Sequence, residues 1–159
     1  MSQSSIITDE MRAVIGQESE PQTVEVDRSA VRMFARAVGH TDPVYYDVEV
    51  ARRRGHRDLP CPPAFLGAPV FNPNQPPGTA YASFKSPFKR VLNGGTEVEY
   101  FDEDICGGDV LTSTSKIADL SERQGSLGPM LIIRFETTYR NKQGQVVAIL
   151  RGTGIQYLV

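Results

Sequence analysis

The sequence has little of what marks several large classes of protein. Its 159 residues include only two cysteines, Cys61 and Cys106, and no Cys-x-x-Cys pair. A disulfide-rich scaffold and the common zinc and redox motifs are therefore excluded. There are also only two histidines, His40 and His56. The carboxylates around them lack the spacing of metal ligands, so we expect no bound metal.

Neither sign of charge dominates, because 17 basic and 19 acidic side chains leave a net charge of −2. This balance does not favour a nucleic-acid or membrane partner, and we expect neither. No apolar run reaches the roughly 18 residues of a membrane-spanning helix. The opening stretch, MSQSSIITDEMRAVIG, lacks the basic and apolar regions of a signal peptide. We therefore expect a cytoplasmic protein.

The composition that remains is that of a globular domain. Apolar residues make up 40% of the chain and charged residues 23%, and the length suits one domain with a sizeable core. No segment repeats another. We expect a single domain over residues 1–159, in which residues 1–20 form a partly loose N-terminal segment and residues 1–7 are its loosest part.

The first half of the chain carries three helix signals. Helices are predicted over residues 9–15, 28–38 and 48–54. A residue that favours the N-cap precedes each helix, and a glycine that favours the C-terminal end follows it. The N-cap residues are Thr8, Asp27 and Asp47, and the glycines are Gly16, Gly39 and Gly55.

The second of these helices has two distinct faces. One face is apolar and is expected to be buried; it consists of Ala30, Val31, Phe34, Ala35 and Val38. Another face carries three arginines at i, i+4 spacing, Arg28, Arg32 and Arg36. A charged stripe of this kind is more often a solvated face. A phosphate-binding stripe is the alternative.

The second half of the chain alternates apolar and polar residues in segments rich in β-branched side chains, which is the pattern of strands. After a short strand at 22–26, longer ones are predicted over residues 96–101, 109–118, 130–140 and 145–157. Turns or loops are expected at 107–109, at 121–128 and at 141–144, where NKQG closes a hairpin. The GGD at 107–109 precedes no helix, so it is interpreted as a turn and not as a phosphate site.

A very apolar segment lies between the two halves. Pro62 and Pro63 suit the start of a helix, where no N–H is required. The residues AFLGAPVF (64–71) are almost all apolar, so this helix should be buried on every side. Residues 72–79, NPNQPPGT, are expected to form a loop. The sequence therefore predicts an α+β fold in which an antiparallel sheet wraps around one central apolar helix.

Four segments in this order carry a family resemblance: VEVDRSAVRMFARAVGHTDPVYYD, LPCPPAF, LNGGTEVEYFDEDICGGDVL and the final long hairpin. They resemble the MaoC-like hydratases and dehydratases of enoyl thioesters, over nearly the whole chain. The chain is most similar to the N-terminal, non-catalytic half-domains of that family, to the dehydratase part of type I fatty acid synthases, and to the non-catalytic subunits of mycobacterial 3-hydroxyacyl-ACP dehydratases. The resemblance implies a single hot-dog fold.

The hydratase motif of this family reads approximately Gly-Asp-x-Asn-Pro-aliphatic-His. Its Asp and His share the water that adds across the C2–C3 double bond, acting as general acid and base. In GHTDPVYYD (39–47) the Asp is replaced by His40, the Asn by Asp42 and the His by Tyr45. The residues that match the motif are Gly39, Pro43 and Val44. The resemblance thus implies a loop that keeps the backbone of the motif without its acid–base pair.

A rearranged pair of His40 and Asp42 is the alternative source of catalysis, because histidine titrates in a useful range. Tyr45 is a poor base at neutral pH, since a phenol ordinarily titrates at about pH 10. The plainer interpretation makes His40 a surface or capping residue and Asp42 part of an Asp-Pro turn. His40 and Asp42 are accordingly the catalytic candidates.

The resemblance also implies a site for an acyl thioester of coenzyme A or an acyl carrier protein, with no other cofactor. A backbone N–H at the start of the central helix would polarise the thioester carbonyl. Basic residues before the sheet would bind the phosphates of the carrier, or would be solvated charges. The substrate-binding candidates are Tyr45, Ala64, Phe65, Gly67, Lys85, Lys89 and Arg90.

Two further residues are open to two interpretations. His56 follows a helix end, where a histidine is more often a loop residue than a ligand. Cys61, among three prolines, is either a packing residue or an accessible reactive thiol.

Three hypotheses follow for the function. In the first, the chain is the non-catalytic subunit of a heteromeric (R)-specific 2-enoyl-thioester hydratase or 3-hydroxyacyl-thioester dehydratase. It would shape the acyl tunnel and help bind the carrier, while a second hot-dog subunit with an intact motif supplies the chemistry. In the second, it is a self-sufficient homodimeric enoyl-CoA hydratase that uses His40 and Asp42. In the third, it binds acyl thioesters without turnover.

Overall fold

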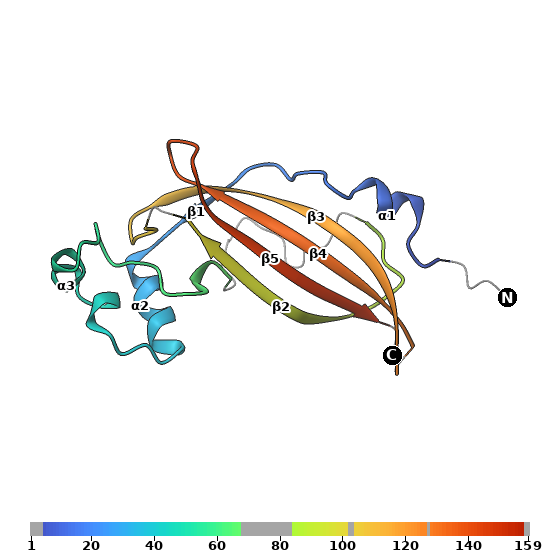
Figure 1. Ribbon diagram of the computed structural model, residues 1–159, viewed down its shortest axis with the longest axis horizontal. Helices are drawn as coiled ribbons and strands as arrows, with labels where there is room; N and C mark the ends of the chain where they lie inside the picture. Colours follow the sequence, from blue (N-terminus) through green and yellow to red (C-terminus); the bar gives the residue numbers. More distant parts are fainter. Residues whose placement is uncertain (1–4, 68–83, 102–103, 127, 158–159) are drawn as a thin grey trace.

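One five-stranded antiparallel sheet dominates the protein (Figure 1). The computed structural model describes residues 5–67, 84–101, 104–126 and 128–157. The strands stand in the order β1-β3-β4-β5-β2. Their bounds are β1 Gln22–Glu25, β2 Arg90–Tyr100, β3 Val110–Gly125, β4 Gly128–Arg140 and β5 Val146–Tyr157. The curled sheet with few helices confirms the predicted α+β hot-dog fold.

The helices are short and gather near the two ends of the sheet. Figure 1 shows α2 and α3 together at one end and α1 toward the other. Their bounds are α1 Asp9–Ala13, α2 Arg28–Ala37 and α3 Val48–Arg53, with single 3-10 turns η1 Pro43–Tyr45 and η2 Phe65–Gly67. In the described ranges, no helix is long and apolar enough to cross a membrane.

The predicted N-caps form as expected. The Thr8 hydroxyl accepts a hydrogen bond from the backbone N–H of Met11. The Asp27 carboxylate accepts from the N–H groups of the second and third residues of α2, and the Asp47 carboxylate does the same for α3. Each cap satisfies N–H groups that have no partner inside the helix, which is why these short helices begin where they do.

The glycines after α2 and α3 end these helices in the same way. Gly39 and Gly55 have positive φ angles of 78° and 94°, which residues with a Cβ rarely adopt. The next N–H in each case returns to a carbonyl five residues back, from His40 to Ala35 at 2.9 Å and from His56 to Ala51 at 3.1 Å. This is the Schellman arrangement. It places both histidines directly after a helix end.

The arginine face of α2 differs from a purely solvated face. Arg28 donates two hydrogen bonds of 2.7 Å to the carboxylate of buried Asp58, and Arg32 donates to the carbonyl of Tyr46 at 3.0 Å. These two arginines therefore connect α2 to other segments, and the face is not purely solvated. The predicted apolar face is also narrower, because Val38 is 51% exposed.

Two predicted boundaries in the sheet are wrong. Residues 121–128 were expected to form a loop, but β3 runs to Gly125 and β4 starts at Gly128. β2 starts at Arg90 and not at residue 96. A bulge with Gly95 at a φ of 144° lets β2 pass through two glycines that otherwise indicate a break.

Buried side chains form two clusters, near opposite ends of the long strands. The first joins the sheet to α2, α3 and the two 3-10 turns, and the second joins it to the N-terminal segment. The first contains Val26, Val31, Val44, Ala51, Leu59, Phe65, Leu66, Ile105, Leu111, Tyr139, Val147, Ala148 and Leu150. The second contains Ile7, Met11, Phe88, Ile117, Leu120, Leu131 and Ile133.

The N-terminal segment is packed over the part that the structure describes. Ile7 is 8% exposed and Met11 1%, and Glu122 of β3 accepts hydrogen bonds from the Ser5 hydroxyl and the Ile7 N–H. Full burial of a side chain such as Met11 contributes about 1.5–3 kcal/mol. The expectation of a loose start therefore does not hold for residues 5–7, because β3 offers them both apolar contacts and a carboxylate.

The apolar segment after the prolines is described only as far as Gly67. Phe65 and Leu66 are 6% and 4% exposed, as expected for core residues. The Phe65 ring meets Phe34 of α2 edge to face, with 5.6 Å between centroids. Residues 68–71 of the predicted central helix and the predicted loop at 72–79 lie outside the described residues.

Candidate functional site

The loop at residues 39–47 is held by its own polar side chains. The Asp42 carboxylate accepts the N–H of Val44 at 3.0 Å and so caps η1. Arg54 donates to both oxygens of the same carboxylate, at 2.7 and 2.8 Å. The Val44 N–H and the Arg54 guanidinium hold the pKa of Asp42 below its usual value. Asp42 is thus an engaged, ionised capping group, which is a poor starting point for a general base.

His40 and Tyr45 lie against each other in this loop. Their ring centroids are 5.1 Å apart with the planes tilted by 38°. The Tyr46 hydroxyl donates a hydrogen bond to the His40 carbonyl, which closes the loop on itself. Tyr45 also packs against the first core cluster. The structure therefore brings two of the three replaced motif positions together, while the Asp42 carboxylate is bound to Arg54.

Tyr45 lines a cavity of about 300 Å³ between the loop, the segment after α3 and the end of β2. Most of its walls are apolar or aromatic. They are Val44, Tyr45, Pro60, Cys61, Pro63, Tyr100, Phe101 and Ile105, and the polar members are His56 and Asp104. A concave, mostly apolar site with a few polar groups is the usual form of a small-molecule site.

His56 and Asp104 form a pair that sequence reasoning missed. The His56 Nδ1 lies 2.6 Å from the Asp104 Oδ2, although the two residues are 48 positions apart. No short motif spans such a separation. His56 does lie in a loop after α3, as predicted, but it has a carboxylate partner there because the segment before β3 folds back beside it.

Backbone hydrogen bonds fix the two segments that carry this pair. The Cys61 N–H donates to the Ile105 carbonyl and the Gly107 N–H to the Leu59 carbonyl, both at 2.8 Å. Arg57 adds two hydrogen bonds of 3.0 Å to the Asp109 carboxylate. Residues 56–61 and 104–109 therefore hold the His56 and Asp104 side chains on a connected frame.

Burial raises the pKa of two side chains of the cavity wall, Cys61 and Tyr100. Burial raises the pKa of the Cys61 thiol far above its ordinary value, which excludes a thiolate nucleophile and leaves packing as its role. Burial, with Cys61 nearby, raises the pKa of Tyr100 to about 12. His56 and Asp104 remain as the polar pair of the cavity wall.

The two predicted carbonyl-binding N–H groups, those of Ala64 and Phe65, lie at the start of η2. The Phe65 N–H already donates to the Pro62 carbonyl at 3.1 Å. Ala64 has a positive φ of 65°, an uncommon conformation that clusters at functional sites. On the far side of the turn, the Tyr139 hydroxyl donates to the Leu66 carbonyl at 3.3 Å. Gly67 is the last residue of η2.

The basic candidates lie at the other end of β2 from the cavity. Lys85, Lys89 and Arg90 are located before or at the first residue of β2, and Tyr100 of the cavity wall is its last residue. Eleven residues of extended chain span about 35 Å at roughly 3.3 Å each. The structure therefore does not bring the three basic residues together with Tyr45.

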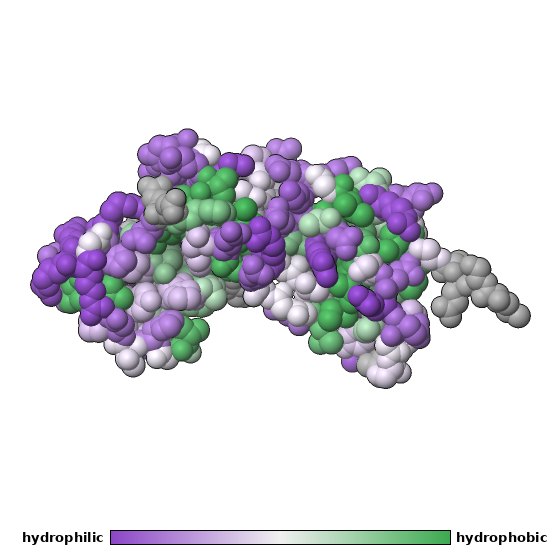
Figure 2. Space-filling model, viewed as in Figure 1, coloured by the Kyte–Doolittle hydropathy of each residue, from purple (hydrophilic) through white to green (hydrophobic). Residues whose placement is uncertain are grey.

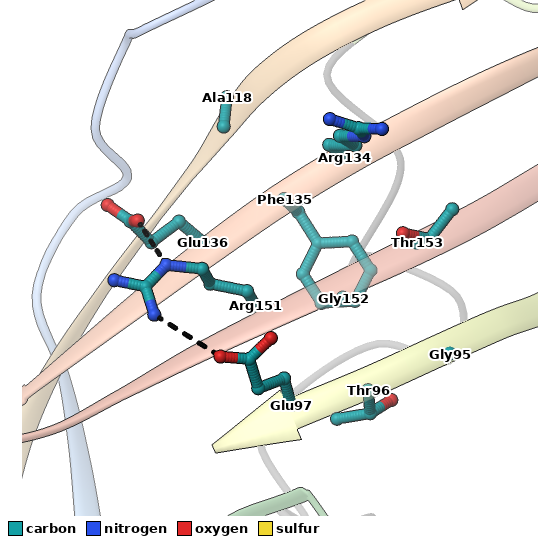
Figure 3. Close-up of a pocket in the computed structure, with 10 residues that line it drawn as sticks. All are labelled: Gly95, Thr96, Glu97, Ala118, Arg134, Phe135, Glu136, Arg151, Gly152 and Thr153. Atoms are coloured by element: carbon teal, nitrogen blue, oxygen red, sulfur yellow. Dashed lines mark ion pairs between the residues drawn. The ribbon is translucent and has the colours of Figure 1, made fainter. Parts of the chain in front are cut away.

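A second hollow, of about 410 Å³, lies over the middle of the sheet and has charged walls (Figure 3). Lys116, Glu136, Arg151 and Glu97 are register partners across four strands. Neighbours in this row form ion pairs, at 3.0 Å for Lys116 and Glu136, 3.3 Å for Glu136 and Arg151, and 3.9 Å for Arg151 and Glu97. Alternating charges between adjacent strands stabilise a sheet, so the row has a structural explanation.

Hydrophobic patches interrupt the polar surface over the sheet (Figure 2). The large apolar side chains that are exposed in β2 are Val91 at 50%, Leu92 at 52% and Tyr100 at 37%. Among the described residues, no three His, Cys, Asp or Glu side chains group in a way that could hold a metal ion.

Comparison with known proteins agrees with this geometry. The family of FAS1-like, dehydratase domain region proteins matches residues 13–150. A UPF0336 protein of Streptomyces griseus is 34% identical over 107 residues, which cover 64% of this chain and 67% of that protein.

Two solved complexes of Mycobacterium tuberculosis contain chains of similar fold. A chain of the HadBC (3R-hydroxyacyl-ACP dehydratase) complex has a TM-score of 0.69 at 20% identity, with 94% of this chain and 98% of that chain covered. A chain of the ChsH1-ChsH2 complex has a TM-score of 0.74 at 19% identity, with 95% and 90% covered. With these MaoC-like hot-dog neighbours and a family match over most of its length, the chain belongs to the FAS1-like dehydratase-region family.

Proposed function

We propose that the chain is the non-catalytic subunit of a heteromeric (R)-specific 2-enoyl-thioester hydratase or 3-hydroxyacyl-thioester dehydratase. The observation that carries this proposal is the state of the motif loop. Asp42 is bound by Arg54, and Tyr45 stands where the family has its catalytic histidine. Hydration needs a group that takes a proton from water and one that gives a proton to C2. Neither motif position offers such a group.

A second hot-dog subunit would supply the missing pair. β2 is the last strand of the sheet order, and its residues are almost all exposed. Among the described residues, none forms a strand beyond β2, so its outer edge can pair with another chain. HadBC and ChsH1-ChsH2, which have similar folds, are complexes of two different hot-dog chains. These observations support a partner with an intact Asp/His motif.

The role of this chain would be to shape the acyl site and help hold the carrier. Phe65 and Leu66 are buried at the start of η2, and Tyr45 lines the adjacent cavity. Lys85, Lys89 and Arg90, near the start of β2, are exposed and would meet the phosphates of coenzyme A or of an acyl carrier protein. Because about 35 Å of β2 separates them from this cavity, they would bind the carrier of an acyl group held at the partner's site and not of one held in this cavity.

Reconstitution tests this proposal. The purified chain, a hot-dog chain with the intact motif, and the two together are assayed for hydration of crotonyl-CoA by loss of enoyl absorbance. We expect negligible turnover by this chain alone, and turnover by the pair that exceeds the sum of the separate chains. If this chain alone turns over crotonyl-CoA robustly, and His40→Ala or Asp42→Ala abolishes that turnover, the proposal is wrong. The chain would then be the homodimeric hydratase. Thioester binding without turnover in any combination would favour the binding protein.

A further inference from the structure

The cavity beside the motif loop contains one polar pair to which the proposed function gives no role. The Asp104 carboxylate can only accept, so the His56 Nδ1–H donates across their 2.6 Å contact. In the neutral ring this leaves the Nε2 lone pair as a hydrogen-bond acceptor. The His56 side chain is 28% exposed, and both residues are part of the cavity wall.

We propose that His56, oriented by Asp104, determines specificity by accepting a hydrogen bond from the hydroxyl group of a 3-hydroxyacyl thioester in this cavity. The inference rests on the proposed function for the identity of the ligand as an acyl thioester. Asp104 acts through His56 and is a positioning residue. A saturated acyl group offers no donor to Nε2, so the pair distinguishes the hydroxylated acyl group from the saturated one.

The rest of the cavity suits a short acyl group. Its volume of about 300 Å³ is at the small end of ligand sites, which range from roughly 300 to 1,000 Å³. Val44, Pro60 and Pro63 offer apolar contacts to the chain. Cys61 and Tyr100 are neutral, so neither competes as an ionised acceptor.

The surroundings keep Asp104 available to His56. The nearest cation on the same frame, Arg57, donates to the Asp109 carboxylate and to the backbone carbonyl of Asp104. Hydrogen bonds of the two segments to each other hold the pair in register. The Asp104 side chain is 54% exposed. Exposed pairs contribute little to stability, so variants of this pair are expected to fold.

Calorimetric titration of the purified chain tests the inference with (R)-3-hydroxybutyryl-CoA and butyryl-CoA, which differ by the one hydroxyl group. We expect the hydroxylated thioester to bind about tenfold more tightly, as one good hydrogen bond allows. His56→Phe should bind both equally while keeping the affinity for butyryl-CoA. Asp104→Asn should reduce the preference, and Glu49→Gln, which breaks an exposed ion pair on α3, should leave it unchanged.

Histidine ring NMR signals give a second measurement, made on the wild-type chain. The chain has only two histidines, and the signal that is lost in the His56→Phe spectrum is that of His56. It should shift on addition of (R)-3-hydroxybutyryl-CoA and much less on addition of butyryl-CoA. Equal affinity for the two thioesters, a preference that survives in His56→Phe, or an unmoved His56 signal overturns the inference. Failure of the reconstituted pair to turn over crotonyl-CoA would instead count against the proposed function.

Discussion

Arg28 donates two hydrogen bonds of 2.7 Å to the Asp58 carboxylate and so ties the first residue of α2 to the segment that carries His56. Asp58 is 6% exposed, and the Leu59 N–H donates to the same carboxylate at 2.9 Å. A buried carboxylate is stable only with such partners. The position of the cavity wall therefore depends on this ion pair, which the sequence alone did not reveal.

Asp58→Ala should lower the free energy of unfolding by about 2 kcal/mol, because it removes hydrogen bonds to a buried charged group. Urea unfolding at neutral pH measures this loss. Glu20→Gln, which removes an exposed carboxylate, should change stability by less than about 0.5 kcal/mol. An Asp58→Ala protein as stable as this control would mean that the ion pair contributes nothing net.

The ion pair of Arg28 and Asp58 should make the free energy of unfolding depend on pH. Hydrogen bonds from Arg28 hold the pKa of Asp58 below its ordinary value of 3.8. Because the pKa of Asp58 is lower in the folded protein than in the unfolded chain, the ionised carboxylate stabilises the folded protein above pH 3.8. This stabilisation is lost as the pH falls from 3.8 through the lower pKa of the folded protein. Between pH 5 and about 3, the wild type should therefore lose more stability than Asp58→Asn. Parallel losses in the two proteins would contradict this.

Gly152→Ala should destabilise the sheet by about 1–3 kcal/mol through overpacking. A Cβ at this position would lie 2.0 Å from the Phe135 ring, its register partner on β4. In the Phe135→Leu background the smaller side chain leaves room, so the same substitution should be less harmful there. Thermal unfolding of the four proteins forms a double-mutant cycle. Equal effects of Gly152→Ala in both backgrounds would rule out the ring contact as the cause.

Met11→Ala should cost about 2–5 kcal/mol, since the side chain is 1% exposed in the second core cluster. Met33→Ala is the matched control, because Met33 is 72% exposed on α2 and its truncation should change stability by less than about 0.5 kcal/mol. Chemical denaturation of both variants measures the difference. Equal stabilities would mean that the N-terminal segment does not stabilise the sheet.

Gly67→Leu tests whether the end of η2 faces an acyl chain. If it does, the variant should fold normally and, with the catalytic partner, should lose activity on long enoyl-CoAs while retaining it on short ones. Phe65→Ala, a core truncation, should instead cost about 3–5 kcal/mol of stability. The measurement is the rate of hydration across a series of enoyl-CoAs of increasing acyl chain length. An unchanged profile in Gly67→Leu would exclude this residue from the tunnel.

The sequence by itself determined the features that depend on neighbours a few positions away. The caps at Thr8, Asp27 and Asp47 satisfy N–H groups within three residues, and Gly39 ends a helix through its own φ angle. Alternation of apolar residues likewise located all five strands. The replacement of the motif's histidine by Tyr45 is also readable directly, because it is a matter of residue identity.

Only the tertiary structure decided which distant residues meet. His56 reaches Asp104 because the segment after α3 pairs with the segment before β3. Arg28 of α2 reaches Asp58, 30 positions away. The full length of β2 was also hidden, because glycine usually weakens a strand and here forms a bulge beside β5. The helix and strand propensities of residues contain no information about such contacts. They arise from sheet register and burial, which fix side chains tens of positions apart within hydrogen-bonding distance.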